Sequence, residues 1–148
     1  MDQPRSFAGI WYRSKPVTES TQADPFVRER GSLAVTGDTI TFQGPRTQVV
    51  MRGVEAVEYG VHGSMNNPSV HVRYREDGEP RSAWLTDGGM GGYAGMFGGT
   101  RRLADALSHL APTTFDDTGA SRVQRRLAWL LVGVVLVFIV RAFRARYT

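Results

Sequence analysis

Apolar and polar residues alternate along the middle of the chain, between about residue 31 and residue 86. Such alternation is typical of half-buried strands in antiparallel sheets, because successive side chains of a strand point to opposite faces. Residues 33–35 and 40–42 predict a hairpin with Gly37 and Asp38 in its turn. The pattern also predicts a short leading strand and loop in residues 1–30, and strands at 47–51, 53–60, 69–75 and 81–86.

A stripe of apolar residues three or four positions apart follows the strands and predicts one amphipathic helix over residues 101–110, with Thr100 as its N-cap. Its members are Leu103, Ala106, Leu107 and Leu110. Residues 111–121 then read as a polar linker. This order of elements predicts a mainly β domain, an antiparallel sandwich or partly open barrel of six to seven strands capped by one helix.

Residues 127–140 carry no charge, and eleven of the fourteen are Leu, Ile, Val or Phe. About twenty apolar residues usually cross a bilayer, but flanking arginines can reach the headgroups and extend a shorter run. We therefore predict a single transmembrane helix over residues 122–146, with a hairpin or a buried core helix as the alternatives. The predicted membrane-interface residues are Arg125, Arg126, Trp129, Arg141, Arg144 and Tyr147.

The N-terminus lacks a basic segment followed by an apolar one, so no secretory signal is visible. Three arginines on each side of the predicted span leave the positive-inside rule undecided. The missing signal predicts a single-pass protein of a bacterial inner membrane, with the N-terminal domain in the cytoplasm.

The net charge of +4 is divided unevenly along the chain. Residues 121–148 hold six Arg and no acid, whereas residues 1–120 hold twelve basic and fourteen acidic residues. The basic charge thus belongs to the predicted membrane flanks, and nucleic acid is not expected as a partner. The chain has no cysteine, which excludes disulfides, thiolate metal sites and cysteine nucleophiles.

Residues 31–42 (GSLAVTGDTITF) and 54–57 (VEAV), together with the helix, resemble bacterial PH-like (GRAM-like) domains. The resemblance covers residues 31–110 and implies a seven-stranded bent sandwich closed by a C-terminal helix. That family binds lipids, peptides or protein partners and generally lacks catalysis. Inositide-binding members carry a basic cluster in the first hairpin, but this hairpin holds Asp38 and no Lys or Arg before Arg46.

Seven of the twelve residues at positions 88–99 are glycine. The stretch contains a GxGxxA pattern, but it follows a meander rather than a βαβ unit, so a dinucleotide site is not expected. One interpretation is a flexible connection into the helix. The other is a partner-binding loop, because the flexible backbone carries adaptable apolar groups. These groups are Met90, Tyr93, Met96 and Phe97.

His62, His71 and His109 do not have the spacing of metal ligands, and no serine lies in a GxSxG motif. The sequence therefore predicts no catalytic residue, metal site or cofactor, and the chain is not expected to be an enzyme.

These observations predict a non-catalytic accessory subunit that stabilises a large bacterial integral-membrane complex, such as a photosynthetic or respiratory one. Its partners would be the lipid bilayer and the membrane complex. Gly133 would face a neighbouring helix, because a small residue lets two helix backbones approach closely. The alternative is a membrane-tethered module that binds a lipid or small ligand. A deep apolar pocket would favour the ligand module, and a packed core would favour the subunit.

Overall fold

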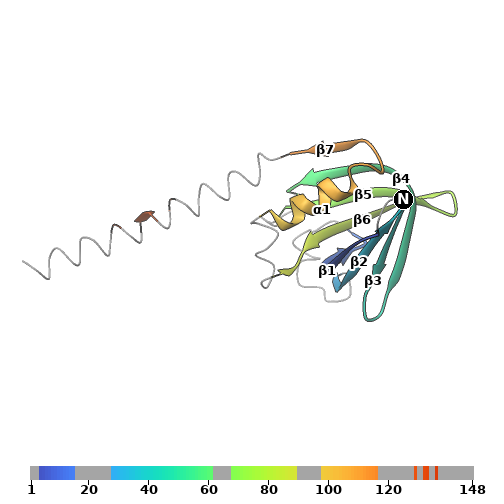
Figure 1. Cartoon of the computed structure of the whole chain (residues 1–148), viewed down its shortest axis with the longest axis horizontal. Helices are drawn as coiled ribbons and strands as arrows, with labels where there is room; N and C mark the ends of the chain where they lie inside the picture. The colour runs from blue at the N-terminus through green and yellow to red at the C-terminus, as the bar shows by residue number, and fades with distance from the viewer. Residues whose placement is uncertain are drawn as a thin grey trace, which may run out of the picture.

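The computed structural model of the chain describes residues 4–15, 28–61, 68–89 and 98–116, and the single positions 129, 132, 133 and 136. Six strands in these ranges form one closed antiparallel barrel, followed in the sequence by a helix and a short seventh strand (Figure 1). The elements are β1 (Arg5–Arg13), β2 (Arg28–Thr36), β3 (Thr39–Gln43), β4 (Gln48–Gly60), β5 (Ser69–Glu76), β6 (Glu79–Asp87), α1 (Gly99–Leu107) and β7 (Thr113–Phe115).

The barrel strands are neighbours in chain order, and the barrel closes where β1 meets β6. Residues 10–13 of β1 pair with residues 84–87 of β6, while the other edge of β1 pairs with β2. Farther round, β3 pairs with both β2 and β4. The prediction of a partly open barrel or sandwich is therefore wrong. The physical reason is the β1–β6 ladder, which joins the two edges that an open meander leaves unpaired.

The turn at residues 37–38 connects β2 to β3 as the sequence predicts, and residues 77–78 connect β5 to β6. The strands predicted at 47–51 and 53–60 are instead one strand of thirteen residues, β4. Its pairing with β5 shifts register between Arg52 and Ala56, and Gly53 lies inside this irregularity with φ +55°. Glycine adopts this left-handed conformation without steric cost, so β4 bends there and continues.

Inward-facing side chains fill the barrel and leave the core residues between 0 and 9 % exposed. The rings of Tyr12 and Phe42 stack across the interior with their centroids 4.8 Å apart. The core also contains Ile10, Leu33, Ile40, Met51, Val57, Val70, Val72, Ala83, Leu85, Leu103, Ala104 and Leu107. The interior is thus a packed hydrophobic core rather than a chamber.

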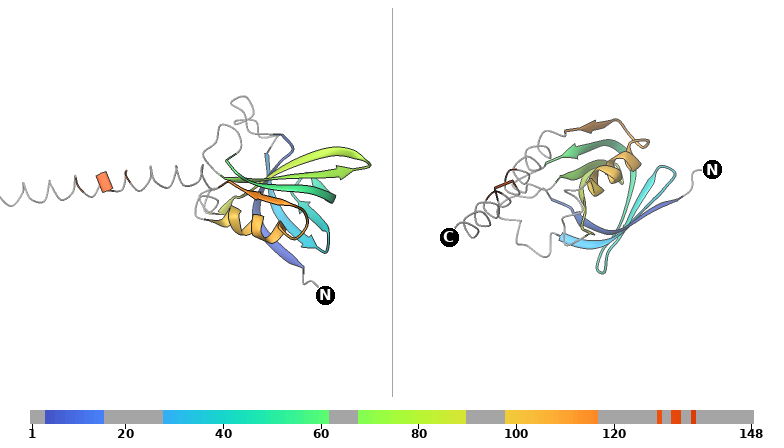
Figure 2. Two further views of the ribbon diagram at one scale, coloured as in Figure 1. Left: turned by 90° about the horizontal axis from the view of Figure 1, so that it is seen from above. Right: turned by 60° about the vertical axis from the view of Figure 1, so that its left-hand side comes forward.

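Helix α1 lies against β4, β5 and β6 and buries Leu103 and Leu107 on the barrel (Figures 1 and 2). Its N-cap is Gly98, which has φ +91°, so the predicted cap at Thr100 is wrong. Thr100 is fully buried inside the first turn, and its hydroxyl accepts a hydrogen bond from the Asp87 N–H over 3.0 Å. The side chain joins the start of α1 to the end of β6.

The prediction of a single transmembrane helix over residues 122–146 requires correction. No helix in the part of the chain that the structure describes is long and apolar enough to cross a membrane. Helix α1 has nine residues, and such a helix rises only about 14 Å against a hydrocarbon core of about 30 Å. The predicted location in a bacterial inner membrane, with a cytoplasmic domain, depended on that span and is withdrawn with it.

Most of the residues assigned to the membrane boundaries lie outside the described residues. These are Arg125, Arg126, Arg141, Arg144 and Tyr147. Trp129 is described and is 75 % exposed. A Cβ added at Gly133 would meet no atom within 4 Å, so the described residues show no close approach there.

Candidate functional site

The two halves of β4 have different neighbours on one edge. β3 has five residues and pairs with residues 48–51, so it ends before the bulge at Gly53. Beyond the bulge, β5 occupies one edge of β4, and β7 pairs in parallel with residues 57–59 on the other. β7 is therefore a short piece of chain laid on an edge that the barrel strands leave open.

Backbone hydrogen bonds hold β7 at both of its ends. The Val57 N–H donates to the Pro112 carbonyl over 3.1 Å, and the Asp116 N–H donates to the Tyr59 carbonyl over 2.8 Å. We call residues 112–116 the resident segment, because they occupy the outer edge of β4 between these two bonds.

Alternate residues of a parallel strand turn their backbone groups towards the same neighbour. The two terminal hydrogen bonds therefore place the N–H and C=O of Thr114 towards β4, and those of Thr113 and Phe115 away from it. Among the described residues β7 is the last strand of the sheet, so its outer edge is open.

Phe115 lies beside Tyr59 on the side of the sheet that carries α1. Their ring centroids are 6.0 Å apart. The guanidinium carbon of Arg101, in the first turn of α1, lies 5.0 Å from the Phe115 centroid and 5.8 Å from the Tyr59 centroid. These separations suit cation–π attraction. Tyr59 is buried, with 4 % of its surface exposed, whereas Phe115 is 38 % exposed. The buried Tyr59 ring and the Arg101 guanidinium thus hold the partly exposed Phe115 ring.

On the other face of the sheet, one row of side chains leads across the strands to β7. Strand register pairs Arg13 with Trp84, Trp84 with His71, His71 with Glu58, and Glu58 with Thr114. The His71 and Trp84 rings stack with centroids 4.5 Å apart and planes inclined by 7°. This row of side chains therefore ends at Thr114, in the resident segment. At the opposite end of the row, burial lowers the pKa of the Arg13 guanidinium.

Glu58, His71 and Ser82 form a hydrogen-bonded chain with the connectivity of a hydrolase triad. His71 Nδ1 lies 3.0 Å from Glu58 Oε2, and His71 Nε2 lies 3.1 Å from Ser82 Oγ. Glu58 also pairs with Arg73 over 3.3 Å. In catalysis such a histidine accepts the serine proton while backbone N–H groups hold the oxyanion in a pocket. One pocket among the described residues lies elsewhere and contains none of these three residues.

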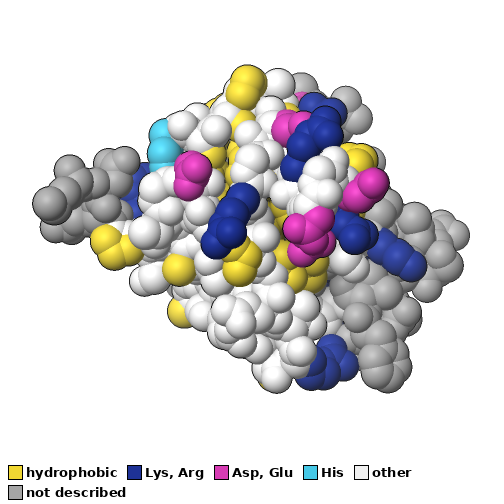
Figure 3. All heavy atoms as spheres, turned by 90° about the vertical axis from the view of Figure 1, so that its right-hand side faces the viewer, with side chains coloured by type: hydrophobic (Ala, Val, Ile, Leu, Met, Phe, Trp, Pro, Cys, Tyr) yellow, Lys and Arg dark blue, Asp and Glu magenta, His cyan; other side chains and the backbone are white. Residues whose placement is uncertain are grey.

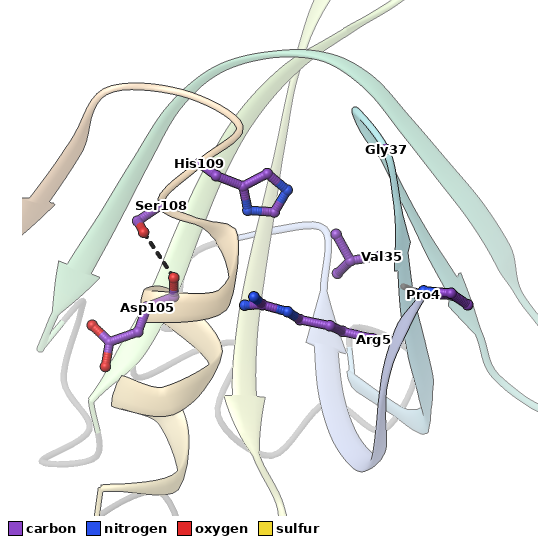
Figure 4. A pocket seen from close by; sticks show the side chains of 7 residues that line it. All are labelled: Pro4, Arg5, Val35, Gly37, Asp105, Ser108 and His109. Carbon is purple, nitrogen blue, oxygen red and sulfur yellow. Dashed lines mark hydrogen bonds between the residues drawn. The ribbon is translucent and has the colours of Figure 1, made fainter. Parts of the chain in front are cut away.

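That pocket, of about 570 Å³, lies between the end of α1, the start of β1, the end of β2 and the β2–β3 turn (Figure 4). Arg5 extends into it from β1 and His109 enters from beyond α1, whereas Asp105 points away (Figure 4). The negative end of the α1 dipole adjoins this pocket and offsets part of the attraction of Arg5 for an anion. The lining residues are Pro4, Arg5, Val35, Gly37, Asp105, Ser108 and His109.

Charged side chains of both signs are interspersed on the face of the molecule drawn in Figure 3. Exposed ion pairs of the described residues include Arg75 with Glu55 over 2.6 Å and Arg81 with Glu76 over 3.3 Å. This face therefore does not present the single-sign field that duplex binding requires.

The predicted partner-binding residues Met90, Tyr93, Met96 and Phe97 lie outside the described residues. The glycine-rich stretch is described only at its start and end. The Gly88 N–H donates to the Gly9 carbonyl over 3.0 Å, and a Cβ at Gly88 would collide with the ring of Trp11. At its start the stretch is thus tied to β1 by close packing that only glycine permits.

No sequence pattern assigns a role to Tyr59, Arg101 or Phe115. Phe115 is an isolated aromatic residue in the stretch interpreted as a polar linker, and it belongs to no alternating run. The available signal was the residues Pro112–Thr–Thr–Phe115 themselves, because proline and β-branched residues favour extended backbone. Three residues are too few for a strand prediction, since pairing with β4 defines β7.

Comparison of the sequence with models of known protein families and with curated proteins finds no match. The resemblance to PH-like domains therefore stays a prediction.

Proposed function

We propose that the chain is a non-catalytic docking domain that binds a protein partner along the outer edge of β4. The observation that carries this proposal is the edge itself. A rigid barrel strand presents backbone hydrogen-bonding groups beside Tyr59 and Arg101, and only three residues of β7 cover them. Backbone pairing and a pocket for alternate side chains are the two components of strand-mediated recognition.

Packing of the barrel supports docking over ligand storage. The core residues are at most 9 % exposed, and native interiors at normal packing density leave few voids larger than a water molecule. From the sequence we expected a deep apolar pocket in a ligand-binding module and a packed core in a subunit that docks on other proteins. The packed core therefore favours docking.

A small-ligand module is the second candidate because Arg5 and His109 converge on one pocket. Ligand sites are usually lined mainly by apolar side chains with a few convergent polar groups. Here Arg5, Asp105, Ser108 and His109 make most of the lining polar, and the helix end opposes an anion. Docking is the better supported function.

Photo-crosslinking in the organism of origin tests the proposal. A benzoylphenylalanine replaces Glu58 in the full chain, because Glu58 is the β4 residue in register with Thr114 and remains in the barrel when β7 leaves. The matched control carries it at Glu79, an exposed position five residues along β6 from Trp84 and so far from β7. We expect one discrete protein adduct at position 58 that is missing at position 79. Identical adducts at both positions, or none at 58, would contradict the proposal.

A second measurement tests the absence of catalysis. Because a triad needs an oxyanion site as well as a hydrogen-bonded serine, we expect no labelling of the full chain by a fluorophosphonate probe. Labelling that disappears in Ser82→Ala and in His71→Asn, but persists in Ser108→Ala, would identify Ser82 as a nucleophile and overturn the non-catalytic function.

A further inference from the structure

We propose that the outer edge of β4 is a strand-docking groove that residues 112–116 occupy in cis, and that an extended partner segment with an aromatic residue replaces them. This inference rests on the proposed docking function and specifies its partner.

The resident segment shows which backbone conformation the groove accepts. Pro112 and Asp116 mark its two ends through the hydrogen bonds to Val57 and Tyr59, and a segment of five extended residues fills the space between them. A partner peptide laid parallel to β4 can form the same hydrogen bonds, because they involve only backbone atoms.

The side chains of the resident segment show which residues the groove selects. Phe115 is held by the Tyr59 ring at 6.0 Å and the Arg101 guanidinium at 5.0 Å. An aromatic ring attracts a cation through its face. The occupant is therefore an extended segment that places an aromatic residue beside Tyr59 and Arg101.

The resident segment is short, and most of it is exposed. β7 has three residues, Thr114 and Phe115 are exposed, and Asp116 after them is exposed too. β4 keeps β5 on its other edge whether or not β7 is in place. Loss of the resident segment thus leaves the barrel pairing intact, which makes exchange with a partner segment possible.

A second copy of the chain is a less suitable source of the segment. The connection from α1 to β7 comprises residues 108–112, and Leu110 and Ala111 within it pack against the core. The Leu110 N–H also donates to the Leu107 carbonyl over 3.0 Å. Exchange between copies would extract these residues from the core, whereas a partner strand has to displace only residues 112–116.

The test measures binding of a fluorescein-labelled peptide with the sequence of residues 111–117, APTTFDD, to the full chain by anisotropy. In Phe115→Ala the resident segment competes less well, so we expect the peptide to bind at least about tenfold more tightly than to the native chain. Thr114→Pro, which removes the N–H that faces β4, is expected to give a similar gain. Phe7→Ala, a partly buried phenylalanine on β1, serves as the control and should give none.

Recognition of the aromatic residue is tested on the background of Phe115→Ala. Adding Arg101→Glu, or replacing the phenylalanine of the peptide by alanine, should remove the gain. Equal peptide affinity for the native chain, Phe115→Ala and Thr114→Pro would overturn the inference. So would dimerisation of Phe115→Ala, measured by sedimentation, because it would identify a second copy as the occupant.

The two proposals fail in different ways. If position 58 crosslinks to one protein but the peptide does not distinguish the variants, the domain docks its partner without strand exchange. If position 58 gives no protein adduct, the docking function itself is wrong.

Discussion

At the scale of single residues, Glu29 is a carboxylate that is 7 % exposed under the β3–β4 turn. Burial raises the pKa of Glu29, but hydrogen bonds from the Thr47 side chain and the Arg46 N–H, together with the charge of Arg46, lower it below its ordinary value of 4.5. The Arg46 N–H donates to Glu29 Oε1 over 2.5 Å. A carboxylate whose pKa is lower in the folded state stabilises the fold when it is ionised.

This sign predicts how stability depends on pH. The contribution of Glu29 is present above pH 4.5 and is lost as the pH falls through the lower folded-state pKa. We expect Glu29→Gln to reduce the free energy of unfolding by about 1 kcal/mol at pH 7. Urea denaturation at pH 7 and at pH 3 checks this. A difference between the two proteins that is as large at pH 3 as at pH 7 would disprove the charge-based explanation.

At the scale of elements, β4 organises the molecule because it joins β3, β5 and β7. The bend at Gly53 permits this, since β3 ends before the bend and β7 begins after it. Sequence reasoning found both halves of β4 from their alternation but divided them into two strands, because a glycine between two apolar runs is also the signal of a turn. Only the pairing with β5 on both sides of the bulge shows that the strand continues.

The bend gives a prediction with a matched control. Gly53→Val places a β-branched residue at φ +55°, which should destabilise the fold by about 1 to 2 kcal/mol. Gly53→Asn should lose less, because asparagine tolerates the left-handed region. Only the Arg75 Cβ, at 3.9 Å, comes near the added Cβ, so sterics do not complicate the comparison. Equal loss of stability in both variants, measured by urea denaturation, would contradict a conformational origin.

At the scale of the whole molecule, closure depends on the N-terminal strand. Local alternation predicts the meander from β2 to β6, but the β1–β6 ladder joins residues more than seventy positions apart and leaves no local signal. The sequence pattern does not show the outer edge of β4 for the same reason, since residues 113–115 form a strand only against residues 57–59. Sequence patterns show which side chains a strand buries, whereas pairing between distant segments decides closure and free edges.

Truncation tests the importance of closure. β1 contributes Ile10 and Tyr12 to the core and pairs on both of its edges, so a fragment of residues 28–116 should not form a native core, whereas residues 4–116 should. Amide chemical-shift dispersion in a ¹H–¹⁵N NMR spectrum distinguishes the two outcomes. A well-dispersed spectrum for residues 28–116 would show that the barrel does not need β1.

The central claim is that a partner binds the outer edge of β4 and that β7 must leave it first. The chain has no cysteine, so Glu58→Cys with Thr114→Cys creates one unique pair at positions that are direct register partners. Oxidation should lock β7 onto β4 if the cysteines reach disulfide geometry, which mass spectrometry of the oxidised protein verifies. We predict that the oxidised protein binds the APTTFDD peptide at least about tenfold more weakly than the same protein after reduction. Equal binding by the locked and the reduced protein would contradict the account.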